Sequence, residues 1–77
     1  MIVNLNEVSK INTFINEAST FESNIDIIRG HYTCDAKSIL ALYSLDLSTP
    51  VKIQINAINE EEANRFEEVF SKYKVEE

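Results

Sequence analysis

Apolar residues recur along the chain at two spacings, which separate the predicted strands from the predicted helices. Every second side chain is apolar in residues 51–57, so this segment is the clearest strand. Residues 24–27 alternate in the same way, and the short, β-branched segment 1–5 is also predicted to be a strand. A turn at residues 29–30 then returns the chain as a second short strand over residues 31–34, and the two segments form a hairpin.

Helical spacing appears in three segments. The first covers residues 7–19, follows Asn6 as its expected N-cap, and has an apolar stripe of Val8, Ile11, Phe14, Ile15 and Ala18. A short helix covers residues 38–43. The third helix begins after Asn59, because Asn59 and Glu62 have the spacing of a capping box. The core stripe of this helix is expected to be Ala63, Phe66, Val69, Phe70 and Tyr73.

The predicted order of elements is strand, helix, strand, strand, helix, strand, helix. Strands joined by a tight turn pair antiparallel, and a helix with one apolar stripe must bury that stripe against another layer. The pattern therefore predicts an α+β fold, a two-layer open-faced sandwich in which helices cover one face of an antiparallel sheet. At 77 residues, the chain is expected to form a single domain over residues 1–77, near the lower size limit for a self-sufficient hydrophobic core.

Composition narrows the possible functions. The chain has 13 acidic against 7 basic residues, a formal net charge of −6, so a direct nucleic-acid partner is not expected. No apolar stretch approaches the roughly 20 residues that span a bilayer, and the start lacks the basic and apolar regions of a secretory signal. Cys34 is the only cysteine, which favours a reducing compartment. We therefore expect a cytoplasmic protein with no membrane insertion.

Three segments resemble the HPr family, the small phosphocarrier proteins of the bacterial sugar phosphotransferase system. They are "FINEASTFESNIDI", "DAKSILALYSLDLS", and "KIQINA" with the "NEEEA" that follows it. The second segment is the most specific of the three. The resemblance extends from Phe14 to the C-terminus and implies an HPr-like four-stranded sheet with the strand order 1-4-2-3. It also implies a role in the regulation of sugar transport.

The resemblance fails where the family has its chemistry. HPr proteins accept a phosphoryl group on a histidine in the loop before the first helix, next to an arginine. Counting back from Phe14 places Glu7 at the position of the histidine and Ser9 at that of the arginine. A carboxylate is a poor acceptor for a stable phosphoryl group, so we expect no catalytic residue. No cofactor is expected either. The glutamates 60–62 suit the first turn of a helix and not a metal site, since hard cations need oxygens that converge from a loop. The resemblance then implies a protein-binding or regulatory module and not an enzyme.

His31 leaves an alternative open, because it is the only histidine in the chain. An imidazole suits phosphoryl transfer, so His31 would serve an active phosphocarrier with a non-standard acceptor. The residue lies in or beside the predicted hairpin turn, away from the loop that the resemblance requires. An exposed hairpin residue without a chemical role is the simpler interpretation.

Ser38 precedes the short central helix and has two interpretations. As an N-cap, its hydroxyl accepts a hydrogen bond from an amide of the first turn. The residue also matches the regulatory serine of the HPr family, which a kinase phosphorylates, and a phosphate would add about two negative charges at this helix start. A cap alone and a cap that is also a phosphosite both stay open.

The short central helix carries more apolar residues than it can bury. Ile39 and Leu42 are expected to point inward, and Leu40 and Tyr43 outward. The resemblance implies a partner-binding surface made of Ile39, Leu40 and Tyr43, contacted by a phosphotransferase-system enzyme, a kinase or a transcriptional regulator. Ordinary packing of the helix is the alternative. Self-association through the edge of the first strand is a further one, so a monomer or weak dimer is expected.

Overall fold

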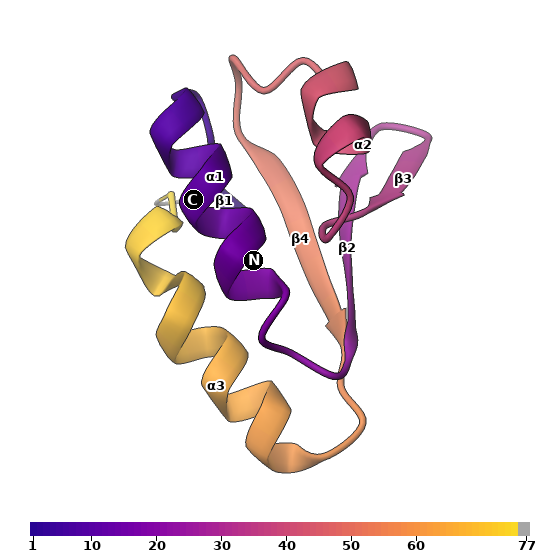
Figure 1. Cartoon of the computed structure of the whole chain (residues 1–77), viewed down its shortest axis with the longest axis vertical. Coiled ribbons are helices and arrows are strands. Elements are labelled where there is room, and N and C mark those ends of the chain that lie inside the picture. Colours follow the sequence, from indigo (N-terminus) through magenta and orange to yellow (C-terminus); the bar gives the residue numbers. More distant parts are fainter. Residues whose placement is uncertain (76–77) are drawn as a thin grey trace.

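The computed structural model describes residues 1–75, apart from the side chain of Ile39. Four strands form one antiparallel sheet in the order β1-β4-β2-β3, and three α-helices cover one of its faces (Figure 1). This arrangement confirms the predicted α+β open-faced sandwich and its strand order. None of the helices in residues 1–75 is long and apolar enough to cross a membrane. In chain order the elements are β1 (Ile2–Val3), α1 (Val8–Ala18), β2 (Asn24–Arg29), β3 (Tyr32–Asp35), α2 (Ile39–Ser44), β4 (Val51–Asn56), α3 (Glu60–Phe70) and the 3₁₀ helix η1 (Ser71–Tyr73).

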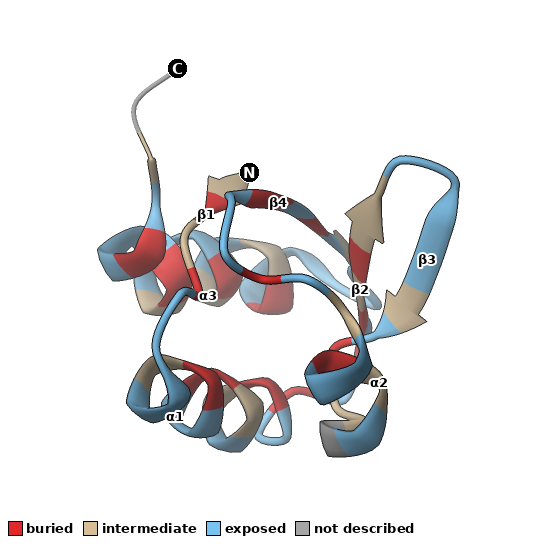
Figure 2. Ribbon diagram, turned by 90° about the horizontal axis from the view of Figure 1, so that it is seen from above, coloured by how far each residue is buried: buried red, intermediate tan, exposed pale blue. Residues whose placement is uncertain are grey.

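The register of the inner strands decides which side chains face the helices. Ile27 lies opposite Ile53 of β4 on one side and Cys34 of β3 on the other, and Ile25 lies opposite Ile55. Ile25, Ile27 and Ile53 are buried, because alternate side chains of a strand point to the same face of the sheet. Figure 2 shows buried residues on the inner strands and on the helices that cover them. The two strands predicted from this alternation, with one buried face, are thus confirmed as β2 and β4.

Phe70 of α3 is the centre of the aromatic core. Its ring centroid lies 5.0 Å from that of Phe14, 5.2 Å from that of Phe66 and 5.6 Å from that of Phe21, and its side chain is fully buried. Ring centroids at these distances make favourable aromatic contacts in addition to the apolar area they bury. A single cluster therefore joins α1, α3 and the segment that leads into β2.

The start of α1 differs from the prediction. Asn6 is not the N-cap, because Glu7 occupies that position with an extended backbone and no side-chain cap hydrogen bond. The Asn6 Oδ1 atom instead accepts a hydrogen bond from Lys10 Nζ at 3.3 Å. Val8 is 61% exposed and not part of the core. It occupies the first turn of the helix, one turn before the buried Ile11, and so lies beyond the packed layer.

Strand β1 is an edge strand of the sheet, but residues 73–75 cover part of its outer edge. It has two residues instead of the predicted five, and the backbone of residues 73–75 runs beside it. Val3 forms an antiparallel bridge with Lys74, and the Asn4 N–H donates to the Tyr73 carbonyl at 2.9 Å. The predicted position of the first strand at the edge of the sheet is confirmed. Residues 73–75 already pair with part of that edge, which leaves fewer free backbone groups there for pairing between chains.

Candidate protein-binding surface

Ser38 begins α2 as the sequence predicts. Its backbone is extended, with φ −95° and ψ 108°, and its Oγ atom accepts a hydrogen bond from the Ala41 N–H at 3.3 Å. Its own N–H donates to the Asp35 carbonyl at 3.1 Å. The N-cap prediction is confirmed. The residue is half-buried, so it is partly accessible at the junction between β3 and α2.

Two charged residues flank Ser38, and backbone groups hold both of them. Asp35 Oδ1 accepts a hydrogen bond from the Lys37 N–H at 2.8 Å, and Lys37 Nζ donates to the Phe21 carbonyl at 2.7 Å. The second bond ties the segment before α2 to the connection between α1 and β2. The carboxylate and the ammonium on the two sides of Ser38 are thus each held by a backbone group.

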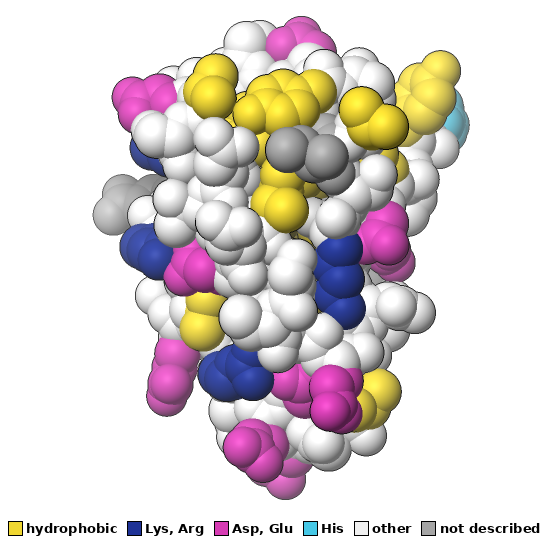
Figure 3. All heavy atoms as spheres, in the orientation of Figure 1, with side chains coloured by type: hydrophobic (Ala, Val, Ile, Leu, Met, Phe, Trp, Pro, Cys, Tyr) yellow, Lys and Arg dark blue, Asp and Glu magenta, His cyan; other side chains and the backbone are white. Residues whose placement is uncertain are grey.

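Helix α2 divides its apolar side chains between the core and the solvent. Leu42 is fully buried, whereas Leu40 is 81% exposed and Tyr43 is 48% exposed, which confirms the predicted orientation of these three residues. The side chain of Ile39 lies outside the described part of the structure. Figure 3 shows hydrophobic side chains gathered at one end of the molecule, over α2 and the start of α1. Apolar groups gathered on a surface in this way often mark a contact with another protein.

A hollow of about 250 Å³ lies between the start of α1, the end of α2 and the loop that follows α2. Tyr43 stands at its side, where Tyr43 Oη and Asn12 Oδ1 form a hydrogen bond of 3.0 Å between α2 and α1. We call it the apolar hollow, because most of its wall is hydrocarbon. Its apolar lining residues are Leu5, Val8, Ile11, Leu42, Tyr43, Leu45 and Leu47, and its polar ones are Asn6, Glu7 and Ser48.

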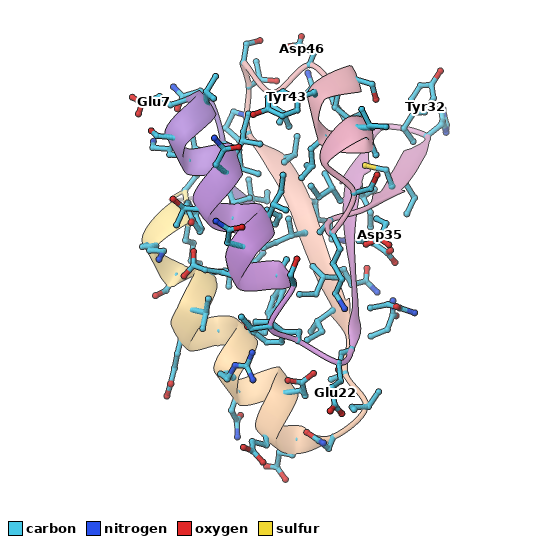
Figure 4. All side chains as sticks on the ribbon, in the orientation of Figure 1. Glu7, Glu22, Tyr32, Asp35, Tyr43 and Asp46 are labelled. Atoms are coloured by element: carbon cyan, nitrogen blue, oxygen red, sulfur yellow. The ribbon has the colours of Figure 1, made fainter. Side chains whose placement is uncertain are left out.

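Glu7 is an exposed carboxylate beside the apolar hollow. From the resemblance to HPr proteins, this residue is expected at the position of their histidine. No ion pair joins it to another side chain in the described part of the chain. Figure 4 shows Glu7 pointing outward at the same end of the molecule as Tyr43 and Asp46. The start of α1 therefore presents a negative charge to solvent.

His31 lies in the turn between β2 and β3, directly after Gly30. Gly30 has a φ of 59°, a left-handed conformation that residues with side chains adopt at a cost. His31 is exposed, and Figure 4 places its neighbour Tyr32 and Glu7 on opposite sides of the molecule. The fold thus keeps the imidazole away from the start of α1. Within residues 1–75, no group of three or more His, Cys, Asp or Glu side chains is arranged to hold a metal ion.

Cys34 lies on the helix-covered face of the sheet, opposite Ile27. Burial, followed by the negative charges of Asp35 and Asp26, raises the pKa of its thiol. The thiolate is the reactive form of cysteine. A raised pKa therefore keeps Cys34 protonated and unreactive near neutral pH.

Sequence reasoning missed part of this surface. Val8 is predicted to lie in the core, and Leu5 and Leu47 carry no surface signal, yet all three line the apolar hollow. Leu5 and Val8 are neighbours in the sequence, whereas Leu47 is about 40 positions away, so only the folded chain brings the two segments together. The one signal in the sequence is the position of Val8 in the first turn of α1, before Ile11 begins the buried face.

The strand order and the short helix capped by a serine define the protein as a small α+β sandwich of the phosphocarrier type. A family model described as the PTS HPr component phosphorylation site matches residues 9–72. Because this match spans most of the 77 residues, the chain belongs to the HPr family, and its role is related to the phosphotransferase system. The matched segment begins at Ser9, after Glu7. No match was found among curated proteins.

Proposed function

We propose that this HPr-family chain is a non-phosphotransferring module that binds a protein partner and regulates the phosphotransferase system in the cytoplasm, with residues 1–77 acting as one domain. The observation that carries the proposal is the exposed pair Leu40 and Tyr43 on α2, of which Tyr43 also lines the apolar hollow. Burying a leucine side chain contributes about 1.5–3 kcal/mol. A partner that covers Leu40 would gain part of this free energy, which the folded chain alone does not use.

The charge of Glu7 argues against phosphoryl transfer at the start of α1. We propose that this residue stands where other HPr proteins have their histidine. Its exposed carboxylate has no ion-pair partner in the described part of the chain, so its negative charge is not offset. It would repel the phosphates of an approaching phosphoryl donor and would not form a stable phosphorylated side chain.

Ser38 is the proposed regulatory site of the same surface. It caps the helix that carries Leu40 and Tyr43, so a modification at Ser38 would change the charge next to the proposed contact. A phosphate there would bring about two negative charges and three strong acceptor oxygens. The proposed partner is therefore a phosphotransferase-system enzyme, a kinase or a transcriptional regulator that reads this charge.

A second candidate function is an active phosphocarrier that uses His31. The observation in its favour is the exposure of the imidazole in the turn between β2 and β3. Such a carrier would present its phosphoryl group on the opposite side of the molecule from Glu7, as the position of Tyr32 in Figure 4 indicates. Its partner enzymes would then contact the hairpin and not the start of α1.

Affinity capture from a lysate of the source cell tests the proposed surface. The wild-type chain is compared with Leu40→Glu and with Ile58→Glu, because Ile58 is also an exposed aliphatic residue but lies in the connection between β4 and α3. We expect a protein that the wild type and Ile58→Glu retain and that Leu40→Glu loses. If Leu40→Glu retains every protein that the wild type retains, the proposed surface is wrong.

A further inference from the structure

The apolar hollow has one charged residue in its wall, Glu7. The other polar lining residues, Asn6 and Ser48, are neutral, and neither Lys nor Arg is among the described residues that line it. Asp46, between Leu45 and Leu47, has a side chain that is 67% exposed and is not among the residues that line the hollow. The hollow therefore combines hydrocarbon walls with negative charge at its margin.

The nearby cations do not neutralise Glu7. Lys10 lies on the same helix, but its ammonium donates to Asn6 Oδ1 at 3.3 Å and forms no ion pair with Glu7. Arg29 reaches Asp46 only at 3.9 Å. Of the two carboxylates, Glu7 is thus the one that lines the hollow and has no ion-pair partner in the described part of the chain. A cation from another molecule would complement it.

We propose that the apolar hollow receives an amphipathic helix of the partner protein, with one large apolar side chain in the hollow and an arginine or lysine against Glu7. This inference rests on the proposed function, and it names the chemistry of the partner. The hollow's volume of about 250 Å³ is below the roughly 300–1,000 Å³ of small-molecule sites. It suits an anchor side chain of a protein better than a whole ligand.

The shape and the charge of the site both favour such a helix. The hollow lies between the start of α1, the end of α2 and the loop after α2. An amphipathic helix can place one apolar anchor side chain in such a hollow and lay the rest of its apolar face against the exposed apolar residues around it. A side chain buried at the centre of a contact carries much of its binding free energy. Arginine suits the position opposite Glu7 particularly well, because its planar guanidinium can form two parallel hydrogen bonds to one carboxylate.

Two synthetic helical peptides of roughly 15 residues test the inference. Both carry the same leucine stripe, one flanked by arginines and the other by glutamates, and each is titrated into the ¹⁵N-labelled full chain. We expect the arginine peptide to shift the amides of Val8, Tyr43 and Leu45 and to bind more tightly than the glutamate peptide. The preference should decrease as salt is added, because both groups of the pair are near solvent.

Glu7→Gln and Glu67→Gln form a matched pair of variants, since both residues are exposed glutamates and Glu67 lies on α3. Glu7→Gln should weaken binding of the arginine peptide by about threefold, and Glu67→Gln should not. Equal affinities for the two peptides, no shift with either, or an unchanged affinity in Glu7→Gln would each overturn the inference. The proposed function would still stand in those cases if Leu40→Glu loses a partner in the affinity capture.

Discussion

Ser23 and Glu62 are joined by two hydrogen bonds to one carboxylate oxygen, although 39 positions separate them in the sequence. Glu62 Oε1 accepts from the Ser23 N–H at 2.9 Å and from the Ser23 hydroxyl at 3.0 Å, and also from the Glu22 N–H at 2.8 Å. Ser23 Oγ in turn accepts from the Ile58 N–H at 3.0 Å. The first turn of α3 thereby holds the segment that leads into β2.

Glu62→Ala should lower the thermal stability of the protein. The substitution leaves two buried or partly buried backbone N–H groups, those of Glu22 and Ser23, without their acceptor, and such unsatisfied donors are costly. We expect the Tm to fall by roughly 5 °C or more, measured by circular dichroism. The exposed neighbour Glu61 provides the control. An equal and small change in Glu61→Ala and Glu62→Ala would show that the buried carboxylate contributes little.

The same carboxylate should make stability depend on pH. The hydrogen bond from the Ser23 N–H, against the opposing effect of burial, holds the pKa of Glu62 below its ordinary value of 4.5. The unfolded chain therefore takes up a proton at a higher pH than the folded chain does. The stabilisation is present above pH 4.5 and is lost as the pH falls through the lower pKa of the folded state.

Urea unfolding at about pH 7 and about pH 3 measures this dependence. The free energy of unfolding should fall more for the wild type than for Glu62→Gln, which cannot titrate at this position. Hydrogen bonds from Ser48 also lower the pKa of Asp46, so part of the acid dependence will persist in the variant. Identical losses in the two proteins would contradict the assigned role of Glu62.

Tyr73→Phe should destabilise the fold without changing its shape. The Tyr73 hydroxyl donates to Glu17 Oε1 at 2.6 Å, between η1 and α1. Burial and the contact with Glu17 raise the pKa of Tyr73, so the phenol stays protonated as a donor. Loss of this bond should lower the free energy of unfolding by about 1 kcal/mol or more. Tyr32→Phe, at a residue 74% exposed, should leave urea unfolding unchanged; equal effects of the two variants would contradict the assignment.

Ser38→Ala should loosen the start of α2. The substitution removes the acceptor of the Ala41 N–H, a change that costs helices about 1 kcal/mol. Hydrogen exchange should be faster at the Ala41 amide in Ser38→Ala, and close to that of the wild type in Ser38→Asp, since aspartate is also a good N-cap. Unchanged exchange in Ser38→Ala would mean that the cap has no energetic role.

Local patterns were sufficient to predict most of the fold. The alternation in β2 and β4 is a direct consequence of one buried and one solvated sheet face, and it identifies Ile25, Ile27 and Ile53 as core residues. The start of α1 could not be predicted in the same way. Asn6 and Glu7 are adjacent polar residues before the helix, and Glu7 occupies the N-cap although asparagine is the better capping residue.

The site was less accessible to sequence reasoning than the fold. Ser38, Leu40 and Tyr43 could be placed because a cap and the two sides of a short helix are local features. The apolar hollow depends on two segments, residues 5–11 and 42–48, that meet only after folding. The buried position of Glu62 could not be predicted for the same reason. Its carboxylate accepts a hydrogen bond from Ser23, which lies far away in the sequence, in the segment that leads into β2.

Phosphoryl transfer to the chain separates a partner-binding module from a phosphocarrier. The purified protein is incubated with phosphoenolpyruvate and the first enzyme of the phosphotransferase system, beside the His31→Ala variant and a histidine-bearing HPr as a positive control. A module that binds partners without carrying phosphate should acquire no acid-labile phosphate while the control does. Acid-labile phosphate on the wild-type chain that disappears in His31→Ala would contradict the account and establish a phosphocarrier that uses its hairpin histidine.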